Sequence, residues 1–352
     1  MLEPVTLAHV AQEAGVSPST VSRILNGTAN VTPEKRARVE AVITRLNFKP
    51  NPQAQALANG RSLSIGVITP TLNSTFYGEA LAGVEAVLND TPYHPLVISG
   101  QWRPEREQEA LDVLLLRRVD AVILMGGILD DAILERVSQR VPMVALGRDV
   151  RGLSESCIVM DNRGGMRLIV NHLLHLGHRK FAYISGAERQ QDAVERRESF
   201  HGTLHQAGVT VPDGLIESGD YTEEGGRQAA ERLLDSDLPF TALVCANDQM
   251  ALGARLTLYR RGIRVPEDMS LTGFDDVFTS SLMTPPLTTV RQAIYDMGEV
   301  AARAALSLLR GERVGMHVFT PELIVRESTH PPAGTRHPAA ASEGSRMTVP
   351  SG

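Results

Sequence analysis

Two patterns of hydrophobic and polar positions divide the chain. Beyond Ser64, short apolar runs alternate with longer segments in which apolar residues recur every three or four positions. Short apolar runs are typical of buried strands, and the wider spacing is typical of amphipathic helices. Their alternation predicts an α/β fold with parallel, doubly wound sheets and helices on both faces. The predicted strands are Ile65–Thr69, Pro95–Ser99, Ala121–Met125, Met143–Leu146, Cys157–Met160, Phe181–Ser185, Leu243–Ala246, Ser270–Phe274 and Thr288–Arg291.

About six strand–helix units precede Gly165 and a comparable set follows it, so we expect two similar lobes. A last helix at Ala293–Leu309 and a strand near Phe319–Arg326 would cross back between them. Ligands bind beyond the carboxyl ends of parallel strands, so the loops there should meet in a cleft. The other predicted helices are Phe76–Leu88, Glu105–Arg117, Gly164–Leu176, Val194–Gln206, Gly225–Leu234 and Met250–Arg261.

The first 26 residues predict two short helices joined by a tight turn. Thr6 is the expected cap of the first helix, and Gly15 supplies the turn. Ser17 and Pro18 then begin the second helix as cap and first helical residue. The two helices pack through apolar side chains at helical spacing, namely Leu7, Val10, Ala11, Ala14, Val21, Ile24 and Leu25.

The outer face of the second helix carries small hydroxyls, one amide and one guanidinium. Hydroxyls and backbone amides hold phosphates, and arginine bonds bidentately to guanine, so this face suits a DNA major groove. The arrangement is that of a helix-turn-helix. The competing interpretation is a pair of ordinary amphipathic helices with a solvated polar face. The residues on the outer face are Pro18, Ser19, Ser22, Arg23 and Asn26.

A third helix begins at Thr32-Pro33 and is followed by a short segment of different character. Asn51 as cap, Pro52 at the first position and Gly60 after the end permit about two turns of helix, which is too short to be stable alone. We expect the folding of this segment to depend on a partner. A plain interdomain linker is the alternative.

The sequence motif AxxAGVSxxTVSRxLN, from Ala11 to Asn26, resembles that of the LacI/GalR family of bacterial transcription factors. The resemblance extends to about residue 328 and implies a body with the periplasmic-binding-protein fold. It also implies that the short segment folds as a hinge helix on operator DNA, paired across a homodimer, with Leu57 wedged into the minor groove. The DNA-contacting residues would be Thr6, Ser17, Pro18, Ser19, Thr20, Ser22, Arg23, Asn26, Asn30, Thr32, Asn51, Ala54, Gln55 and Leu57.

The domain organisation that follows has four parts: a DNA-binding head at 1–49, a hinge at 50–61, an effector-binding and dimerisation body at 62–328, and a disordered tail at 329–352. Lobe 1 would span about 62–162 and 292–317, and lobe 2 about 163–291 and 318–328. The tail is rich in Pro, Ala, Ser and Gly. It has no leucine heptads, so we expect a dimer rather than a tetramer.

Polar residues at the ends of the predicted strands indicate a site for a polyhydroxylated ligand. Such a ligand needs planar groups that bond two hydroxyls at once and an aromatic face for its C–H side. By resemblance, Arg196, Asn247 and Asp275 match effector-contacting positions, and Tyr221 falls where sugar-binding members often place an aromatic ring. Phe76, Arg148, Asp161 and Gln292 are further candidates for lining. Asp248 and Asp276 are assigned to helix capping instead.

Some positions depart from the best-known members of the family. Met125 and Gly147 stand where a polar residue and an aspartate help to hold the effector in the lactose or purine repressors. Ser199 replaces a common glycine, and Pro18 begins the reading helix. The effector and the operator of either archetype therefore do not transfer to this chain.

Charge is distributed unevenly along the chain. Residues 1–61 hold seven Lys/Arg against four acids, and the remainder holds 28 against 37. A basic head on an acidic body is expected when one end meets phosphates. Cys157 and Cys245 lie in apolar runs and are expected to be buried thiols. The N-terminus shows no export signal and no apolar segment approaches 18 residues, so we expect a cytoplasmic protein.

The sequence thus predicts a repressor whose affinity for a palindromic operator is controlled by a small sugar-like effector. The alternatives are a co-repressor-dependent regulator that responds to a purine or another metabolite, a stand-alone sugar-binding protein, and an enzyme acting on sugars. No phosphate-binding glycine loop or nucleophile elbow appears, so neither a cofactor nor catalysis is expected. The spacing of His172, His175 and His178 could suggest a metal, but Gly177 ends that helix and a structural role is favoured.

Overall fold

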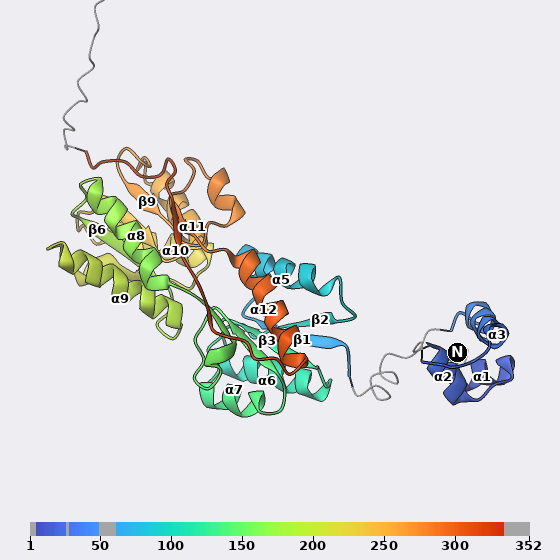
Figure 1. Cartoon of the computed structure of the whole chain (residues 1–352). Helices are drawn as coiled ribbons and strands as arrows, with labels where there is room; N and C mark the ends of the chain where they lie inside the picture. Colours follow the sequence, from blue (N-terminus) through green and yellow to red (C-terminus); the bar gives the residue numbers. More distant parts are fainter. Residues whose placement is uncertain (1–4, 26–27, 49–60, 334–352) are drawn as a thin grey trace, which may run out of the picture.

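The computed structural model describes residues 5–25, 28–48 and 61–333. The predicted hinge helix, with Asn51, Ala54, Gln55 and Leu57, lies outside these residues, as does Asn26. The described chain forms a small helical head and an α/β body (Figure 1).

The described part of the head contains three helices: α1 (Leu7–Ala14), α2 (Pro18–Leu25) and α3 (Pro33–Arg45). The Thr6 hydroxyl accepts a hydrogen bond from the His9 amide, and Gly15 ends α1 with φ 62°, a left-handed conformation that favours glycine. Ser17 Oγ accepts from the Thr20 amide at 3.2 Å and so caps α2. The core consists of Val10, Ala11, Ala14, Val21, Ile24, Val39, Val42 and Phe48.

Lobe 1 of the body is built on a parallel sheet of six strands, in the order β11-β5-β4-β3-β1-β2 within the described chain. Its strands are β1 (Ser64–Thr69), β2 (His94–Ser99), β3 (Ala121–Met125), β4 (Met143–Leu146), β5 (Cys157–Met160) and β11 (His317–Phe319). Its helices are α5 (Thr75–Leu88), α6 (Pro104–Leu116), α7 (Asp131–Ser138) and α12 (Ile294–Leu309).

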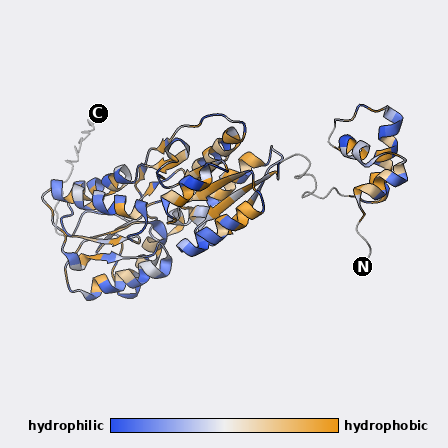
Figure 2. Cartoon of the chain, turned by 90° about the horizontal axis from the view of Figure 1, so that it is seen from below, coloured by the Kyte–Doolittle hydropathy of each residue, from blue (hydrophilic) through white to orange (hydrophobic). Residues whose placement is uncertain are grey.

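Alternate residues of the lobe 1 strands face two different helix layers. On β1, Ile65 and Val67 lie in the core shared with α5 and α12, whereas Ile68 lies in the core shared with α6 and α7. The strands of this sheet are mainly apolar in Figure 2, as expected of a parallel sheet covered on both faces.

Lobe 2 has a parallel sheet of four strands in the order β7-β6-β8-β9. Its strands are β6 (Phe181–Ser185), β7 (Ile216–Ser218), β8 (Ala242–Cys245) and β9 (Ser270–Thr272). Its helices are α8 (Asn162–His175), α9 (Gln191–Gln206), α10 (Glu223–Asp235) and α11 (Asp248–Arg260). An antiparallel ribbon joins β10 (Thr289–Arg291) to β12 (Glu322–Ile324), and the 3-10 turns are η1 (Ser154–Ser156), η2 (Asp213–Leu215) and η3 (Phe278–Leu282).

The chain differs from the sequence-based expectation at three places in the body. Five strands, not about six, precede Gly165, and β11 from the far end of the chain is the sixth strand of that sheet. The single strand expected near Phe319–Arg326 is two strands in different sheets, because Pro321 between them has no amide to donate to a ladder. Helix α7 was not among the predicted helices.

The predicted disordered tail begins too early. The His330 carbonyl accepts hydrogen bonds from His178 Nε2 at 2.9 Å and from the Ser270 hydroxyl at 3.0 Å. Thr329 Oγ1 lies 2.9 Å from His172 Nε2. These contacts hold the chain against lobe 2 at least as far as His330, and residues 334–352 lie outside the described ones.

The remaining structural expectations concern cysteine, metal and membrane. Cys157 and Cys245 are both buried free thiols, and burial raises the pKa of Cys157 to about 11. The ranges 5–25, 28–48 and 61–333 contain no cluster of His, Cys, Asp or Glu able to hold a metal ion. Over the same ranges, every helix is too short or too polar to cross a bilayer.

Candidate functional site

The outer face of α2 is open to solvent. Ser17, Pro18, Ser19 and Arg23 are exposed, while Thr20 and Ser22 are partly covered. Arg23 Nε donates to the Ser19 carbonyl at 3.2 Å, so its side chain lies along the helix.

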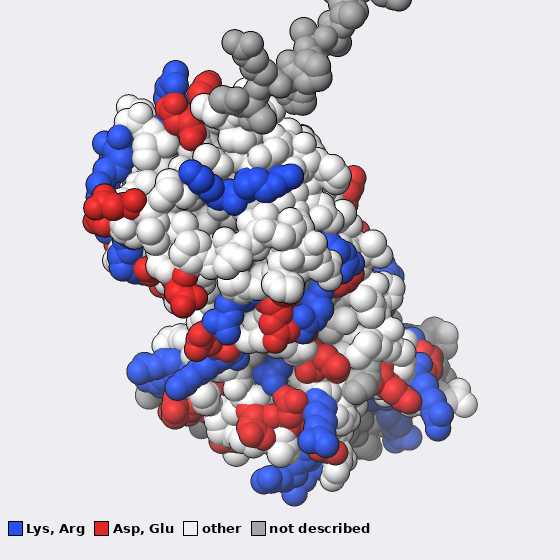
Figure 3. All heavy atoms as spheres, turned by 90° about the vertical axis from the view of Figure 1, so that its left-hand side faces the viewer, with Lys and Arg blue, Asp and Glu red and all other residues white. Residues whose placement is uncertain are grey.

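Three further candidate DNA contacts flank this face. Thr6, Asn30 and Thr32 are all exposed, and Thr6 and Thr32 cap α1 and α3 with their hydroxyls. The head therefore has exposed polar side chains at the starts of its helices. On the face of the protein in Figure 3, by contrast, blue and red side chains intermix over the body rather than forming a basic stripe.

A cleft of about 390 Å³ lies between the two lobes, beyond the carboxyl ends of the strands. Its size is that of a small-molecule site. Lobe 1 lines it with Pro70, Thr71, Asn73, Ser74, Phe76, Tyr77, Gln101 and Trp102. Lobe 2 and the ribbon line it with Asp192, Arg196, Asp220, Tyr221, Thr222, Glu223, Asn247, Gln249, Asp275 and Gln292.

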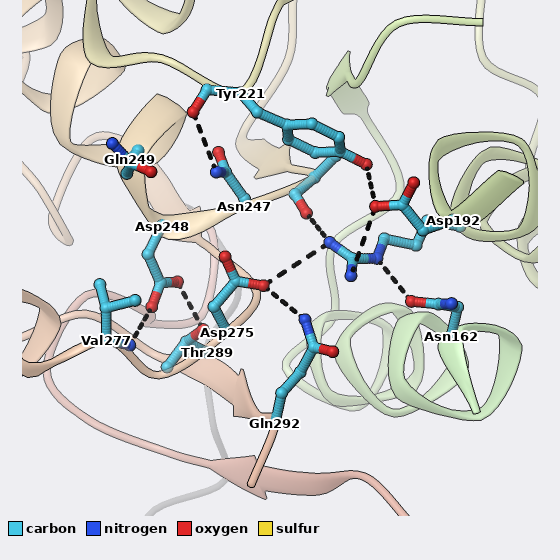
Figure 4. Close-up of polar contacts among 12 residues, drawn as sticks. Asn162, Asp192, Tyr221, Asn247, Asp248, Gln249, Asp275, Val277, Thr289 and Gln292 are labelled. Carbon is cyan, nitrogen blue, oxygen red and sulfur yellow. Dashed lines mark hydrogen bonds and ion pairs between the residues drawn. The ribbon is translucent and has the colours of Figure 1, made fainter. Parts of the chain in front are cut away.

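Arg196, on α9, lines the lobe 2 side, and its partners Asn162, Asp192 and Asp275 are labelled in Figure 4. Its side chain is 4% exposed. Nε donates to Asn162 Oδ1 at 2.9 Å, and Nη1 donates to the Ala246 carbonyl at 2.6 Å. Carboxylate oxygens of Asp275 and Asp192 lie 3.7 and 3.9 Å from the guanidinium nitrogens. The guanidinium is thereby fixed in position with two carboxylates beside it.

The charge of this arginine is retained despite its burial. Burial lowers the pKa of Arg196, but Tyr221, Asp192 and Asp275 raise it by more, so the net shift is upward. The Phe274 ring supports the guanidinium from one face, with its centroid 3.8 Å from Arg196 Cζ. The donors of Arg196 are consequently preorganised before any ligand arrives.

Tyr221 and Asn247 complete the lobe 2 side. The Tyr221 hydroxyl donates to Asp192 at 2.8 Å, and its ring packs so closely on Gly186 that a Cβ there would lie 2.4 Å from the ring. Burial raises the pKa of Tyr221 well above its usual range, so the hydroxyl stays protonated. Asn247 Oδ1 caps α11 by accepting from the Met250 amide, and Nδ2 donates to the Tyr221 carbonyl at 3.2 Å.

Asp275 and Gln292 bond directly to each other. Gln292 Nε2 donates to Asp275 Oδ1 at 2.7 Å, and both side chains are buried. Burial raises the pKa of Asp275 well above its usual range, while the nearby Arg196 acts in the opposite direction.

The lobe 1 side is aromatic. Phe76 and Tyr77 meet edge to face with centroids 5.2 Å apart, and Trp102 lies 6.3 Å from Tyr77. Gln101 and Trp102 both have positive φ, 56° and 53°. Across the cleft, Tyr221 at 65° and Asp275 at 126° share this feature. Residues in such conformations persist where surrounding contacts impose them, and they cluster at binding sites.

A smaller chamber of about 40 Å³ adjoins the cleft. The two spaces share Phe76, Tyr77, Trp102, Asp192, Arg196 and Gln292. Gly126, Gly127 and Gly147 form part of its wall, and a Cβ at Gly147 would meet nothing closer than 3.8 Å. Gln190, 5% exposed, also lines it, and among the described residues its Oε1 has no hydrogen-bond partner.

Comparison with known proteins matches both the head and the body to described families. The family described as bacterial regulatory proteins, lacI family, matches residues 6–51, and a periplasmic binding protein-like domain matches residues 170–329. The HTH-type transcriptional regulator GalS of Salmonella typhimurium is 35% identical over 327 residues, which cover 92% of this chain and 96% of GalS. The chain belongs to the lacI family of bacterial regulatory proteins.

This lacI-family chain also matches solved structures over almost its whole length. A lac repressor dimer bound to operator and the anti-inducer ONPF gives a TM-score of 0.83 at 32% identity, covering 93% of this chain and all of that one. A complex of the transcriptional regulator CelR with cellobiose gives 0.69 at 31% identity, covering 92% and 99%. The fold predicted from the pattern is therefore confirmed, and the chain is a DNA-binding transcriptional regulator.

Six of the eight effector candidates of this lacI-family chain line the cleft: Phe76, Arg196, Tyr221, Asn247, Asp275 and Gln292. Asp161 does not, because its carboxylate caps α8 by accepting from the Gly164 amide at 2.7 Å. Arg148 does not line the cleft either: it lines the smaller chamber and a separate surface pocket beside Asp131, and its guanidinium bonds the Gly127 and Leu129 carbonyls and pairs with Asp131.

The two predicted capping carboxylates are structural, although neither caps a helix. Asp248 accepts from the Ser280 and Thr289 hydroxyls, at 2.6 Å each, and Asn247 is the cap of α11. Asp276 pairs with Arg291 and Arg326.

The sequence interpretation missed several cleft residues. The candidate site residues did not include Tyr77, Trp102, Asp192, Asp220, Glu223 and Gln249. The one available signal was the rarity of tryptophan, since the chain has a single one.

Proposed function

We propose that this regulator binds a palindromic operator as a homodimer, and that a small polyhydroxylated effector in the cleft controls its operator affinity. The observation that carries the proposal is the fixed set of Arg196, Asn247 and Asp275 opposite an aromatic wall. Planar donors and acceptors bond pairs of hydroxyls, and aromatic rings cover the C–H face of a sugar. Cellobiose in the CelR complex supports the same ligand class.

Exposed apolar side chains support the homodimer. Leu252, Leu256 and Tyr259 follow helical spacing along α11 and are 37%, 42% and 71% exposed. Phe278 and Leu282 on η3 are 75% and 65% exposed, and the hydrogen bond from Arg255 Nε to the Thr284 carbonyl ties the loop after η3 to α11. Exposed apolar patches of this kind mark interaction surfaces. A second head is also needed because one reading helix covers only a half-site.

The start of lobe 1 can transmit the effect of ligand binding to the head. The Asp120 carboxylate accepts from the amides of Ser62 and Leu63 at 3.0 and 2.8 Å. The chain leaving the head is thus fastened to the lobe 1 sheet. A change in the relative position of the lobes moves this attachment point, and a ligand that prefers one arrangement shifts operator affinity by its differential affinity.

One direct hydrogen bond already links the lobes at the cleft. Ser74 Oγ, at the start of α5, donates to Gln249 Oε1 on α11 at 3.2 Å. Two discrete arrangements of the lobes would differ in this contact.

The test begins with selection of a preferred duplex from a random library by the full-length chain. Binding to that duplex is then measured by fluorescence anisotropy, with and without neutral sugars, amino sugars and purines. The proposal expects at least one sugar to change operator affinity, and expects Arg196→Met to abolish that change while DNA binding persists. A purine that acted where every sugar failed would assign the cleft to a nucleobase, which the aromatic wall could also stack.

A further inference from the structure

The cleft is lined by hydrogen-bond acceptors whose capacity is only partly used. Four carboxylates line it: Asp192, Asp220, Glu223 and Asp275. Arg196 is the only cation among its described lining residues. Even without Asp275, three carboxylates face one guanidinium.

Each carboxylate engages the protein through one oxygen. Tyr221 donates to Asp192 Oδ2, Thr222 to Asp220 Oδ1, Gln249 to Glu223 Oε1, and Gln292 to Asp275 Oδ1. Within the part of the chain that the structure describes, the second oxygen of each has no hydrogen bond. A carboxylate offers about four lone-pair sites, so these groups retain room for donors.

On the lobe 2 side, the amide and guanidinium donors are partly committed within the protein. Asn247 Nδ2 donates to Tyr221, Gln249 Nε2 to Glu223, and Gln292 Nε2 to Asp275. Arg196 gives Nε and Nη1 to internal oxygens and has two carboxylates within 4 Å. An arriving anion would meet a cation that is already neutralised.

The smaller chamber extends the same chemistry. Its buried Gln190 Oε1 is an acceptor without a partner in the described chain, and such a group is costly unless a donor reaches it. The second cation of the chamber wall, Arg148, is already paired with Asp131 and bonded to the Gly127 and Leu129 carbonyls. Here too, the group that fits carries an O–H or an N–H.

We propose that the cleft selects a donor-rich ligand that is neutral or carries an ammonium group, and that it rejects phosphorylated or carboxylated sugars. This inference rests on the proposed function, because it specifies the ligand class of the same site. A phosphate or carboxylate supplies acceptors only, and like charges brought together at a binding site cost several kcal/mol, or about 30-fold or more in affinity.

The chain has a single tryptophan, so quenching of its fluorescence by charged ions can measure the electrostatic potential of the cleft without any ligand. Trp102 is half-buried and lines the cleft. Its fluorescence should be quenched more by caesium than by iodide, each normalised to free N-acetyltryptophanamide, by about threefold at low ionic strength. Equal quenching by the two ions, or stronger quenching by iodide, would overturn the inference.

Two double variants test which charges are responsible. Asp220→Asn with Glu223→Gln removes two exposed carboxylates of the cleft and should bring the caesium-to-iodide ratio close to one. Glu85→Gln with Asp90→Asn removes the same charge near the far end of α5 and should leave the ratio unchanged. Identical ratios in the two double variants would show that the cleft carboxylates do not set the potential, and would overturn the assignment.

Ligand triplets then separate this inference from the proposed function. Glucose, galactose and mannose are titrated calorimetrically into the full-length protein, each as the neutral sugar, the 2-amino sugar and the 6-phosphate. We expect the 6-phosphate to be the weakest member of any triplet that binds, by at least about 30-fold. A 6-phosphate that binds as tightly as its neutral parent contradicts the charge inference alone. If no member of any triplet binds while quenching still favours caesium, the potential stands and the sugar effector fails.

Discussion

The two walls of the cleft differ in chemistry although both lobes are parallel α/β sheets. Lobe 2 contributes the charged residues, already joined into a network around Arg196. Lobe 1 contributes Phe76, Tyr77 and Trp102 with neutral polar neighbours and no ionised group. The difference implies a division of labour. In the proposed function, lobe 2 binds the hydroxyls of the ligand, whereas lobe 1 covers the ligand and transmits its presence to the chain that leads to the head.

The largest effect is expected on the lobe 2 wall. Arg196→Met should weaken effector binding by at least about 100-fold, because charge-assisted hydrogen bonds contribute about 1.5–3 kcal/mol each. It should also lower the free energy of unfolding by about 3–5 kcal/mol, since Asp275 and Asp192 lose a buried partner. Calorimetric titration and urea unfolding measure the two quantities.

Two further variants show whether a loss of effector binding in Arg196→Met results only from misfolding. Arg197→Met removes the next guanidinium, which pairs with Glu188 outside the cleft, and should leave effector affinity unchanged. Arg196→Lys keeps the charge but loses the planar fork, so it should fold and still bind poorly. If Arg196→Lys bound the effector with native affinity, the planar guanidinium of Arg196 would not be needed for binding.

An intermediate effect is expected on the lobe 1 wall. Trp102→Ala removes a ring that lines the cleft. Aromatic contacts contribute about 0.5–1.5 kcal/mol beyond burial, so effector affinity should fall about tenfold. Trp102→Phe should recover most of the loss. A drop as large as that of Arg196→Met would mean that the two walls do not divide the work as argued.

The attachment of the linker should affect coupling rather than binding. Asp120→Ala removes the carboxylate that accepts from Ser62 and Leu63, so movement of lobe 1 should reach the head less effectively. We expect unchanged effector affinity and a smaller effector-induced change in operator affinity, measured by anisotropy. Asp112→Ala, on α6 in the same lobe, is the control. A full response in Asp120→Ala would exclude this route.

The smallest effect concerns pH and the lobe 2 scaffold. Burial lowers the pKa of His178, so the folded protein keeps it neutral, whereas the unfolded chain takes up a proton near pH 6.5. The stability contributed by neutral His178 is therefore present above about pH 6.5 and is lost as the pH falls below that value. His178→Gln should show a smaller decrease in Tm between pH 7.5 and 5.5 than the native chain. His205→Gln should match the native chain, and an undiminished decrease in His178→Gln would contradict the assignment.

The same contrast shows what the sequence could predict. The helices of the head and most strands of the body follow from local signals: caps at Thr6 and Thr32, a left-handed Gly15, and uninterrupted apolar runs such as Ala121–Met125. The chemistry of lobe 2 was also accessible, because Arg196, Asn247 and Asp275 stand at positions that the family resemblance marks.

The aromatic wall of lobe 1 was harder to predict. Trp102 lies in a loop with positive φ, where no periodicity operates, and only the paired strands β1 and β2 bring it beside Tyr77. Asp161 and Arg148 were predicted wrongly as cleft residues for the opposite reason. Each has a suitable side chain, but Asp161 caps the start of α8 and Arg148 bonds to the neighbouring loop at Gly127. Long-range packing decides such cases, and spacing along the chain does not encode it.

The central claim is that binding of the effector in the cleft and the release or capture of DNA occur together. Trp102 fluorescence and operator anisotropy can be followed in the same titration of effector into a protein–duplex complex. Both signals should change with the same midpoint, and both should be lost in Arg196→Met. Saturation of the Trp102 signal with no change in operator affinity would contradict this claim.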